Sequence, residues 1–328
     1  MQAGEKTKMR KIKIIIITTL SSFLLLSSVI CHPTSVYAAP VGLSIDPPLL
    51  KVQIKPGKSI TKVFKIENKE SIDKNIIARI VPFNKSDNLG NPIIDLKSKT
   101  SWLNYFNLSN SNIKLDEPFL LKGKTTDQLI LSLAIPETAN LEDLYVTLLI
   151  STYDNVTSAE QKGTLISATI GSNILVSVTS GLNPPTLLKI NKFYPTSGNF
   201  IKIGRRFIAD NLTPMTFTAT VQNDGLFITE TKGTFKVMNK KENIHLQGIL
   251  PQYIISKNSR ILVNSDGNPF SFNPTLNNIG IYNINIDLKS ENANSSNSIE
   301  IIFIPFKAIL GLSVTLIILR IIFTKKKE

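Results

Sequence analysis

Between residues 40 and 305 the chain is a series of short apolar runs, and helical spacing is hard to find among them. Apolar and polar residues alternate in "SITKVFKIENK" (59–69) and in "MTFTATVQND" (215–224), so that neighbouring side chains point to opposite faces of a strand. Clusters of Asn, Gly, Pro and Asp separate such runs. This pattern predicts an all-β fold of the sandwich type.

The series of strands occurs twice. The alternation places Phe217, Ala219 and Val221 on one face of the later run, and the earlier run gives one face made of Ile60, Lys62, Phe64 and Ile66. A turn-forming Asn ends each run, at Asn68 and Asn223. The repeat predicts two tandem immunoglobulin-like sandwiches, at residues 40–182 and 183–305, joined near "SGLNPPTL" (180–187).

A tyrosine opens one strand in each half. Tyr145 follows Asp143 in "LEDLY", and Tyr282 follows Gly280 in "NIGIY". In immunoglobulin-like sandwiches a Tyr near the start of strand F bonds the backbone through its hydroxyl. We therefore predict a tyrosine corner at both positions. The strand after Tyr145 is apolar on both faces, which predicts that another element or the second sandwich covers its outer face.

The N-terminal 39 residues have the three parts of a secretory signal peptide. A basic stretch from Lys6 to Lys13 precedes an apolar segment, Ile14 to Ile30, and "VYA" (36–38) supplies the small residues that signal peptidase requires. An uncleaved signal anchor is the alternative. Cys31 does not make a lipoprotein signal, because Ile30 stands where a small residue is needed.

The C-terminal end predicts a single membrane pass. Residues 308–319 carry no charge, and a helix over residues 306–323 would span about 27 Å, close to the thickness of a bilayer core. Lys325, Lys326 and Lys327 predict a cytoplasmic tail at 324–328. The two sandwiches are accordingly expected outside the cell.

The ends account for most of the formal charge of +13. Each end contributes +4, which leaves only +5 for the extracellular part and argues against a nucleic-acid partner. The single Cys lies in the signal peptide, so no disulfide or cysteine nucleophile is expected in the exported chain.

The sequence offers little chemistry for catalysis, metal binding or cofactor binding. His245 is the one His that remains after signal cleavage, and we interpret it as a surface residue. The carboxylate pairs at 116–117 and 142–143 lie in turns, and "NSDGNPF" (264–270) is a hairpin turn that lacks the ligand spacing of a calcium loop. We predict no catalytic residue, no metal site, no cofactor and no enzyme activity.

Trp102, Tyr105 and Phe106 form the densest aromatic group. Exposed rings would suit a sugar-binding platform, but large aromatic residues are mostly buried. We therefore favour packing of Trp102 in the sandwich core.

Longer stretches resemble a known family. "IDPPLLKVQIKPGKSITKVFKIENKES" and "SWLNYFNLSNSNIKLDEPFLLKGKTTDQLILSLAIPETANLEDLYVTLLIS" look like the first domain of WxL-interacting proteins, and "FTATVQNDGLFITETKGTFKV", "GILPQYIISKNSRILV" and "NNIGIYNINIDL" look like their second domain. "TLLIST" stands where family members usually carry a double Gly, so the resemblance leaves open the peptidoglycan contact proposed for that domain. The resemblance implies a bacterial, membrane-anchored surface protein.

The expected function is therefore non-enzymatic. A protein of the cell membrane would present two sandwiches that bind cell-wall material or a partner envelope protein, with pairing along a strand edge as one mode. A structural spacer, or an accessory subunit of a membrane complex, is the alternative. A hydrolase that depends on His245 ranks third.

Overall fold

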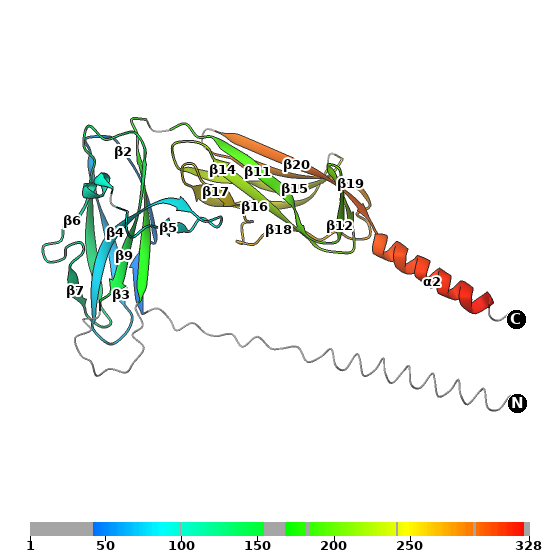
Figure 1. The fold of residues 1–328 in the computed structure, drawn as a ribbon, viewed down its shortest axis with the longest axis horizontal. Helices are drawn as coiled ribbons and strands as arrows, with labels where there is room; N and C mark the ends of the chain where they lie inside the picture. The colour runs from blue at the N-terminus through cyan, green and yellow to red at the C-terminus, as the bar shows by residue number, and fades with distance from the viewer. Residues whose placement is uncertain are drawn as a thin grey trace, which may run out of the picture. The chain divides into compact units, whose positions relative to one another are not determined.

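The protein is described by a computed structural model that covers residues 42–98, 100–153, 168–181, 184–240, 242–290 and 293–324. The fold is mostly β, as predicted, and its strands form four sheets (Figure 1). The predicted signal peptide (1–39) and the Lys residues of the predicted tail lie outside the described residues.

The first half of the chain forms two sheets. One has the strand order β1 (Leu43–Asp46), β3 (Ser59–Asn68), β8 (Thr126–Ala134) and β6 (Phe106–Leu108). The other has the order β2 (Leu49–Ile54), β10 (Thr169–Val178), β9 (Asp143–Thr152), β4 (Lys74–Ser86) and β5 (Pro92–Ile94), and β7 (Pro118–Leu121) also pairs with β4. A short 3-10 helix, η1 (Ser101–Tyr105), precedes β6.

The second half repeats this arrangement with different strand lengths. One sheet contains β11 (Leu188–Ser197), β14 (Met215–Asn223), β17 (Ser259–Ile261) and β18 (Phe270–Phe272). The other has the order β12 (Phe200–Ile203), β13 (Arg206–Asp210), β20 (Asn294–Ile304), β19 (Gly280–Lys289), β15 (Thr229–Asn239) and β16 (Glu242–Ile254). Helix α2 (Phe306–Thr324) follows β20 almost directly.

Each pair of sheets encloses its own apolar core, which makes each pair a β-sandwich, as predicted. The first core takes all its buried residues from positions 43–178 and the second from 188–303. The predicted boundary at 182–183 falls between β10 and β11, outside the described residues.

Where the sequence alternates between apolar and polar residues, the apolar face of the strand is the buried one. Phe217, Ala219 and Val221 of β14 are fully buried, as predicted. In β3 the predicted face is confirmed for Ile60, Phe64 and Ile66, which pack in the first core, whereas Lys62 on the same face is exposed.

The two asparagines that end β3 and β14 are a structural repeat. Asn223 is fully buried; its amide donates to the carbonyls of Phe227 (2.8 Å) and Ile254 (3.0 Å) and accepts from the N–H of Gly225 (2.9 Å). Asn68, also fully buried, makes the same three kinds of bond, with Ile72, Leu121 and Glu70. Each Asn thus satisfies backbone groups that the turn after its strand would leave unpaired.

Helix α2 covers the predicted membrane segment at 306–323. Within the part of the chain that the structure describes, no helix meets the length and apolarity needed to cross a membrane. For residues 318–319 and 321–324 the structure describes the backbone and not the side chains.

Candidate functional site

The two tyrosines of the repeated motif point in opposite directions. Tyr282 faces the second core with Ile284 and Ile286, as the alternation of β19 predicts. In β9 the inward set is Leu144, Val146, Leu148 and Ile150, so Tyr145 lies on the outer face. The positions of the two residues are therefore not equivalent.

The prediction of two tyrosine corners is wrong. The Tyr282 hydroxyl has a side-chain partner, the amide of Asn278 at 3.4 Å, and its ring packs edge-on against Phe303. The Tyr145 hydroxyl does accept a backbone N–H, at 2.9 Å, but the donor is Ser256 of the second sandwich. A corner within the first sandwich would require an inward ring, and the phase of β9 turns this ring outward.

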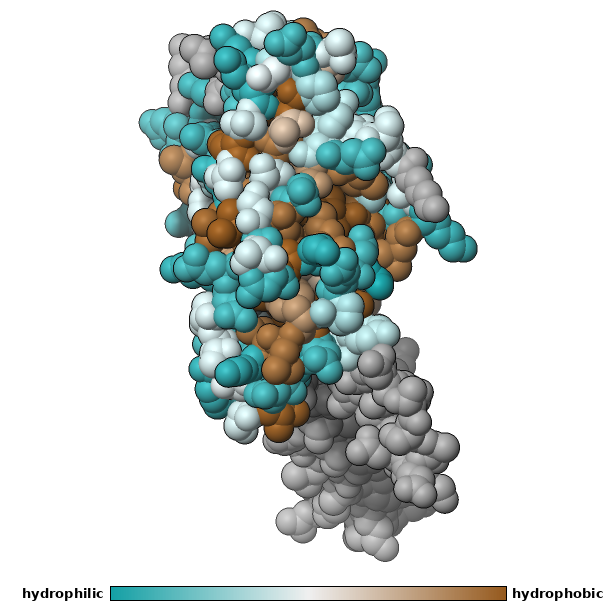
Figure 2. Space-filling model, turned by 90° about the vertical axis from the view of Figure 1, so that its left-hand side faces the viewer, coloured by the Kyte–Doolittle hydropathy of each residue, from teal (hydrophilic) through white to brown (hydrophobic). Residues whose placement is uncertain are grey.

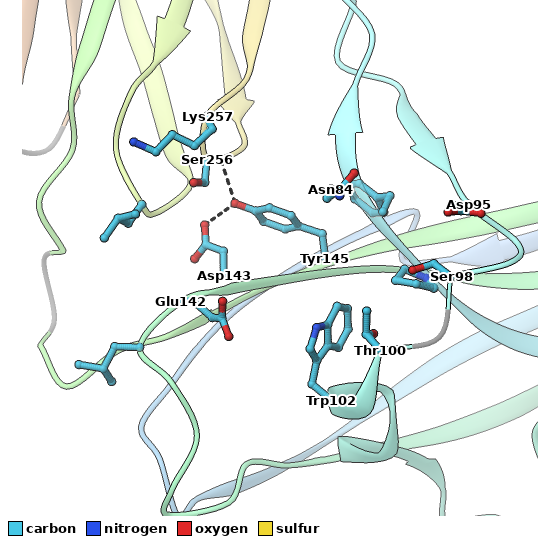
Figure 3. Close-up of a pocket in the computed structure, with 14 residues that line it drawn as sticks. Asn84, Asp95, Ser98, Thr100, Trp102, Glu142, Asp143, Tyr145, Ser256 and Lys257 are labelled. Carbon is cyan, nitrogen blue, oxygen red and sulfur yellow. Dashed lines mark hydrogen bonds between the residues drawn. The ribbon is translucent and has the colours of Figure 1, made fainter.

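Tyr145 instead belongs to a hydrogen-bonded group that joins the two sandwiches (Figure 3). Its hydroxyl donates to Oδ2 of Asp143, which lies two residues earlier on the same strand face. The same Oδ2 accepts the backbone N–H of Ile228, which precedes β15. We call Asp143, Tyr145, Ile228 and Ser256 the latch.

Apolar side chains surround the latch. Phe83, Tyr145 and Leu175, from three neighbouring strands of the first sandwich, pack with Ile228 and Ile255 of the second, and all five are buried. The rings of Phe83 and Tyr145 stack with centroids 5.6 Å apart. The prediction that the second sandwich covers the outer face of this strand is thus confirmed at Tyr145.

The environment of the latch changes the acidity of both side chains. Burial raises the pKa of Asp143, while hydrogen bonds from Ser177, Tyr145 and Ile228 and the charge of Lys51 act in the opposite direction. Burial also raises the pKa of Tyr145, and the neighbouring Asp143 charge adds to that increase. The phenol therefore stays protonated and donates to the carboxylate.

A second group of contacts joins the sandwiches at the turn after β4. The side chain of Asn258 accepts the N–H of Ser86 (3.1 Å) and donates to the carbonyl of Asn84 (3.2 Å), and the N–H of Ile261 donates to the carbonyl of Asn88 (2.7 Å). Burial lowers the pKa of the nearby Arg260, an effect that Asp87 partly offsets. Two separate sets of hydrogen bonds therefore hold the sandwiches together.

A hollow of about 430 Å³ lies beside the latch. Its walls combine aromatic rings with carboxylates and one cation: Phe83, Trp102, Tyr145, Asp95, Glu142, Asp143 and Lys257. Figure 3 shows Trp102 and Thr100 below the Tyr145 ring, with Glu142 at one side and Ser256 and Lys257 above. Aromatic faces beside hydrogen-bond acceptors are what a pocket for a polar organic ligand requires.

The predicted aromatic group is divided between the core and this hollow. Phe106 is buried, whereas Trp102 is half-buried, packs against the first core and also lines the hollow. The prediction that Trp102 packs in the core is therefore only partly correct.

The latch could not be predicted from local sequence, because Ile228 and Ser256 lie 85 and 111 residues from their partners in the first sandwich.

The other residues considered from the sequence lie apart from the hollow. His245 packs against the rings of Phe235 and Phe272, and Asp116 pairs with Arg79 at 3.3 Å. The segment 264–270 is a turn organised by the side chain of Asn264. Among the described residues, no group of three or more His, Cys, Asp or Glu side chains could hold a metal ion.

The sequence matches no protein-family model, and no curated protein is significantly similar. Among solved structures, the chain has weak similarity to the YadV chaperone (7% identity, TM-score 0.36, covering 79% of this chain and 99% of that one). The E. coli chaperone DraB is 10% identical, with a TM-score of 0.35, over 79% of this chain and 94% of that one. A PapD-like domain of human CEP192 is 11% identical, with a TM-score of 0.30, over 46% of this chain and 96% of that one. Similarities this low say nothing about what the chain binds, and the resemblance to WxL-interacting proteins stays a prediction.

Proposed function

We propose that this chain is a non-enzymatic binding protein of the cell envelope, attached to the membrane by α2, with two sandwiches that bind cell-wall material or a partner envelope protein. The observation that carries the proposal is the hollow beside the latch, where Trp102, Asp95 and Glu142 line one space. Its volume of about 430 Å³ is in the range of pockets for small ligands or for a short polymer segment.

The latch supports this function because it fixes one wall of the hollow against the other. Leu226, Ser256 and Lys257 come from the second sandwich, and the other lining residues come from the first. The hydrogen bonds from Ile228 and Ser256 hold these walls at one distance before any ligand arrives. Such preorganisation lowers the entropy cost of binding.

The chemistry of the lining suits cell-wall polymers. Carboxylates accept hydrogen bonds from sugar hydroxyls and amines, and indole and phenol rings pack against the apolar faces of sugars. The wider surface also supports a macromolecular partner: Figure 2 shows apolar residues gathered between hydrophilic ones on one face. Exposed apolar side chains of the first sandwich include Val63, Leu96 and Leu120.

The position of Trp102 supplies a direct test, because it is the only Trp in the chain and lines the hollow. Titration of the full-length protein in detergent with solubilised peptidoglycan fragments should change its fluorescence. Glu142→Gln should weaken binding roughly tenfold, the usual worth of a charge-assisted hydrogen bond. Glu117→Gln, outside the hollow, is the matched control. Absence of binding both to these fragments and to intact cell walls and envelope proteins would refute the proposal.

Attachment to the membrane is part of the same proposal. Six large apolar side chains of α2 are about half or more exposed: Ile309, Leu310, Leu312, Val314, Leu316 and Ile317. Water is an unfavourable environment for such a surface, whereas lipid is a favourable one. Cell fractionation should recover the full-length chain with membranes and release a chain that ends at residue 305.

A structural spacer is the second candidate, and the two sets of contacts between the sandwiches favour it. A spacer needs a fixed geometry and no occupied hollow. Glu142→Gln would then leave the cellular function intact, while loss of the Tyr145 hydroxyl would impair it.

A further inference from the structure

Two loops of the second sandwich lie at the end where α2 begins. β13 runs parallel to β20 and places Asp210 opposite Ile304, so the loop 211–214 starts at this end. β19 runs antiparallel to β20 and places Gly280 opposite Phe303, so the loop before β19 also reaches this end. Figure 1 shows the start of α2 beside these strand ends.

Both loops, and the start of β19, expose apolar side chains there. The exposed fractions are 45% for Leu212, 58% for Leu276, 58% for Ile279 and 52% for Ile281. We call these four residues the base collar. Apolar side chains clustered on solvent-facing loops mark a contact surface, since loops in water are normally polar.

Hydrogen bonds hold the two loops together. Asn211 is fully buried, and its amide donates to the carbonyls of Thr275 (3.1 Å), Leu276 (3.3 Å) and Asn278 (3.4 Å). The N–H of Thr275 in turn donates to the side chain of Asn278 at 2.7 Å. The exposure of the collar is therefore built into the fold and is not the result of a loose loop.

The start of α2 is fixed to the same region. The buried carboxylate of Asp210 accepts the backbone N–H of Lys307 at 3.2 Å and the hydroxyl of Thr213 at 2.9 Å. The ammonium of Lys307 donates to Thr213 at 3.0 Å. The base collar thus lies at the end of the second sandwich where α2 begins, with Lys307 at the junction.

We propose that the base collar enters the boundary between lipid headgroups and acyl chains around the start of α2, so that the second sandwich rests on the bilayer. This inference depends on the membrane attachment proposed above. The occupant is lipid because the collar continues the apolar surface of α2 and because a cation accompanies it, the combination that anionic headgroups favour. Side chains of interfacial segments enter this boundary by about 5–10 Å.

Brominated lipids measure the depth of a tryptophan and can test the collar. The full-length chain with Trp102→Phe would carry Ile279→Trp and be reconstituted in phosphatidylcholine–phosphatidylglycerol vesicles. Ile203→Trp is the matched control. Ile203 is 60% exposed and ends β12, where it pairs with Arg206 at the end of β13 that is farther from the collar. Bromine near the headgroup end of the acyl chains should reduce the emission of the indole at 279 about twofold, as expected for a group within the interface, and leave the control unchanged.

Each other result overturns the inference. If the protein binds vesicles but the indole at 279 is not quenched, the collar does not enter the bilayer, although the attachment by α2 stands. If the protein does not float with the vesicles, both proposals are refuted. Protection of position 279 that depends on protein concentration and not on lipid would assign the collar to a second copy of the chain. Leu276→Trp repeats the test if the first variant unfolds by circular dichroism. Binding by the hollow is measured separately through Trp102, so its failure is distinguishable.

Discussion

Replacement of Tyr145 by Phe removes one oxygen atom from the latch and keeps the ring. The ring stacks on Phe83 at 5.6 Å, and a Phe ring can occupy the same place. The lost hydroxyl donates to Asp143 and accepts the N–H of Ser256 at 2.9 Å. The substitution therefore isolates the polar part of the contact between the sandwiches.

The structure sets the size of the effect. A hydrogen bond to a charged group contributes about 1.5–3 kcal/mol and a neutral one about 1 kcal/mol. Part of the loss is recovered, because water from the adjacent hollow can reach the carboxylate. We expect Tyr145→Phe to lower the free energy of unfolding by about 3 kcal/mol.

Urea denaturation and calorimetry of the full-length chain in detergent measure this loss. Tyr282→Phe is the matched control, since its hydroxyl makes one contact at 3.4 Å, which is long for a hydrogen bond, and should cost less than about 0.5 kcal/mol. A variant that loosens the sandwiches should also split the calorimetric transition. Equal losses for the two substitutions, or a larger loss at Tyr282, would refute the assignment of Tyr145 to the latch.

Four further predictions concern buried polar groups and the turn after β4. The folded-state pKa of Asp143 is raised above 3.8, so its contribution to stability is full below that pH and is lost as the pH rises through the folded pKa. Urea unfolding should therefore show Asp143→Asn gaining stability relative to wild type as the pH is raised from 3.8. Hydrogen bonds from Asn91 lower the pKa of Asp87, so the contribution of Asp87 to stability is lost as the pH falls through its folded pKa. Asp87→Asn should therefore be less stable than wild type in urea unfolding, by an amount that shrinks below pH 3.8. Asn68→Ala and Asn223→Ala each remove three hydrogen bonds from a fully buried amide and should cost about 3 kcal/mol in urea unfolding, whereas a loss below about 1 kcal/mol would contradict their structural role. Asp210→Ala removes the acceptor at the start of α2 and should cost about 1 kcal/mol, seen as faster hydrogen exchange in the first turn of the helix; unchanged exchange would show that the cap is not needed.

Sequence alternation predicted the faces of β14 and β19 because each of these strands has one apolar and one polar face. Phe217 and Ile284 could be assigned to the core on that ground, and both are fully buried. The asparagines that end β3 and β14 were also visible as a repeat. Their local positions, at the end of an alternating run and before a turn, reflect a local physical cause.

β9 could not be read in this way. It is apolar on both faces, so its sequence does not reveal which residues point inward, and a shift of one residue exchanges the faces. Tyr145 and Tyr282 stand in similar local sequences but in different environments. The partners that decide the environment of Tyr145 are distant in the chain, and only the fold brings them together.

The direct passage from β20 into α2 determines how a mechanical load would enter the protein. β20 has a hydrogen-bonded neighbour on each side, with ten residue pairs to β19 and four to β13. A pull on α2 along the axis of this strand would load those bonds in shear, so that many must break at once and forced unfolding would be slow. If α2 attaches the chain to the membrane as proposed, a load on α2 would therefore reach the second sandwich through the hydrogen bonds on both sides of β20.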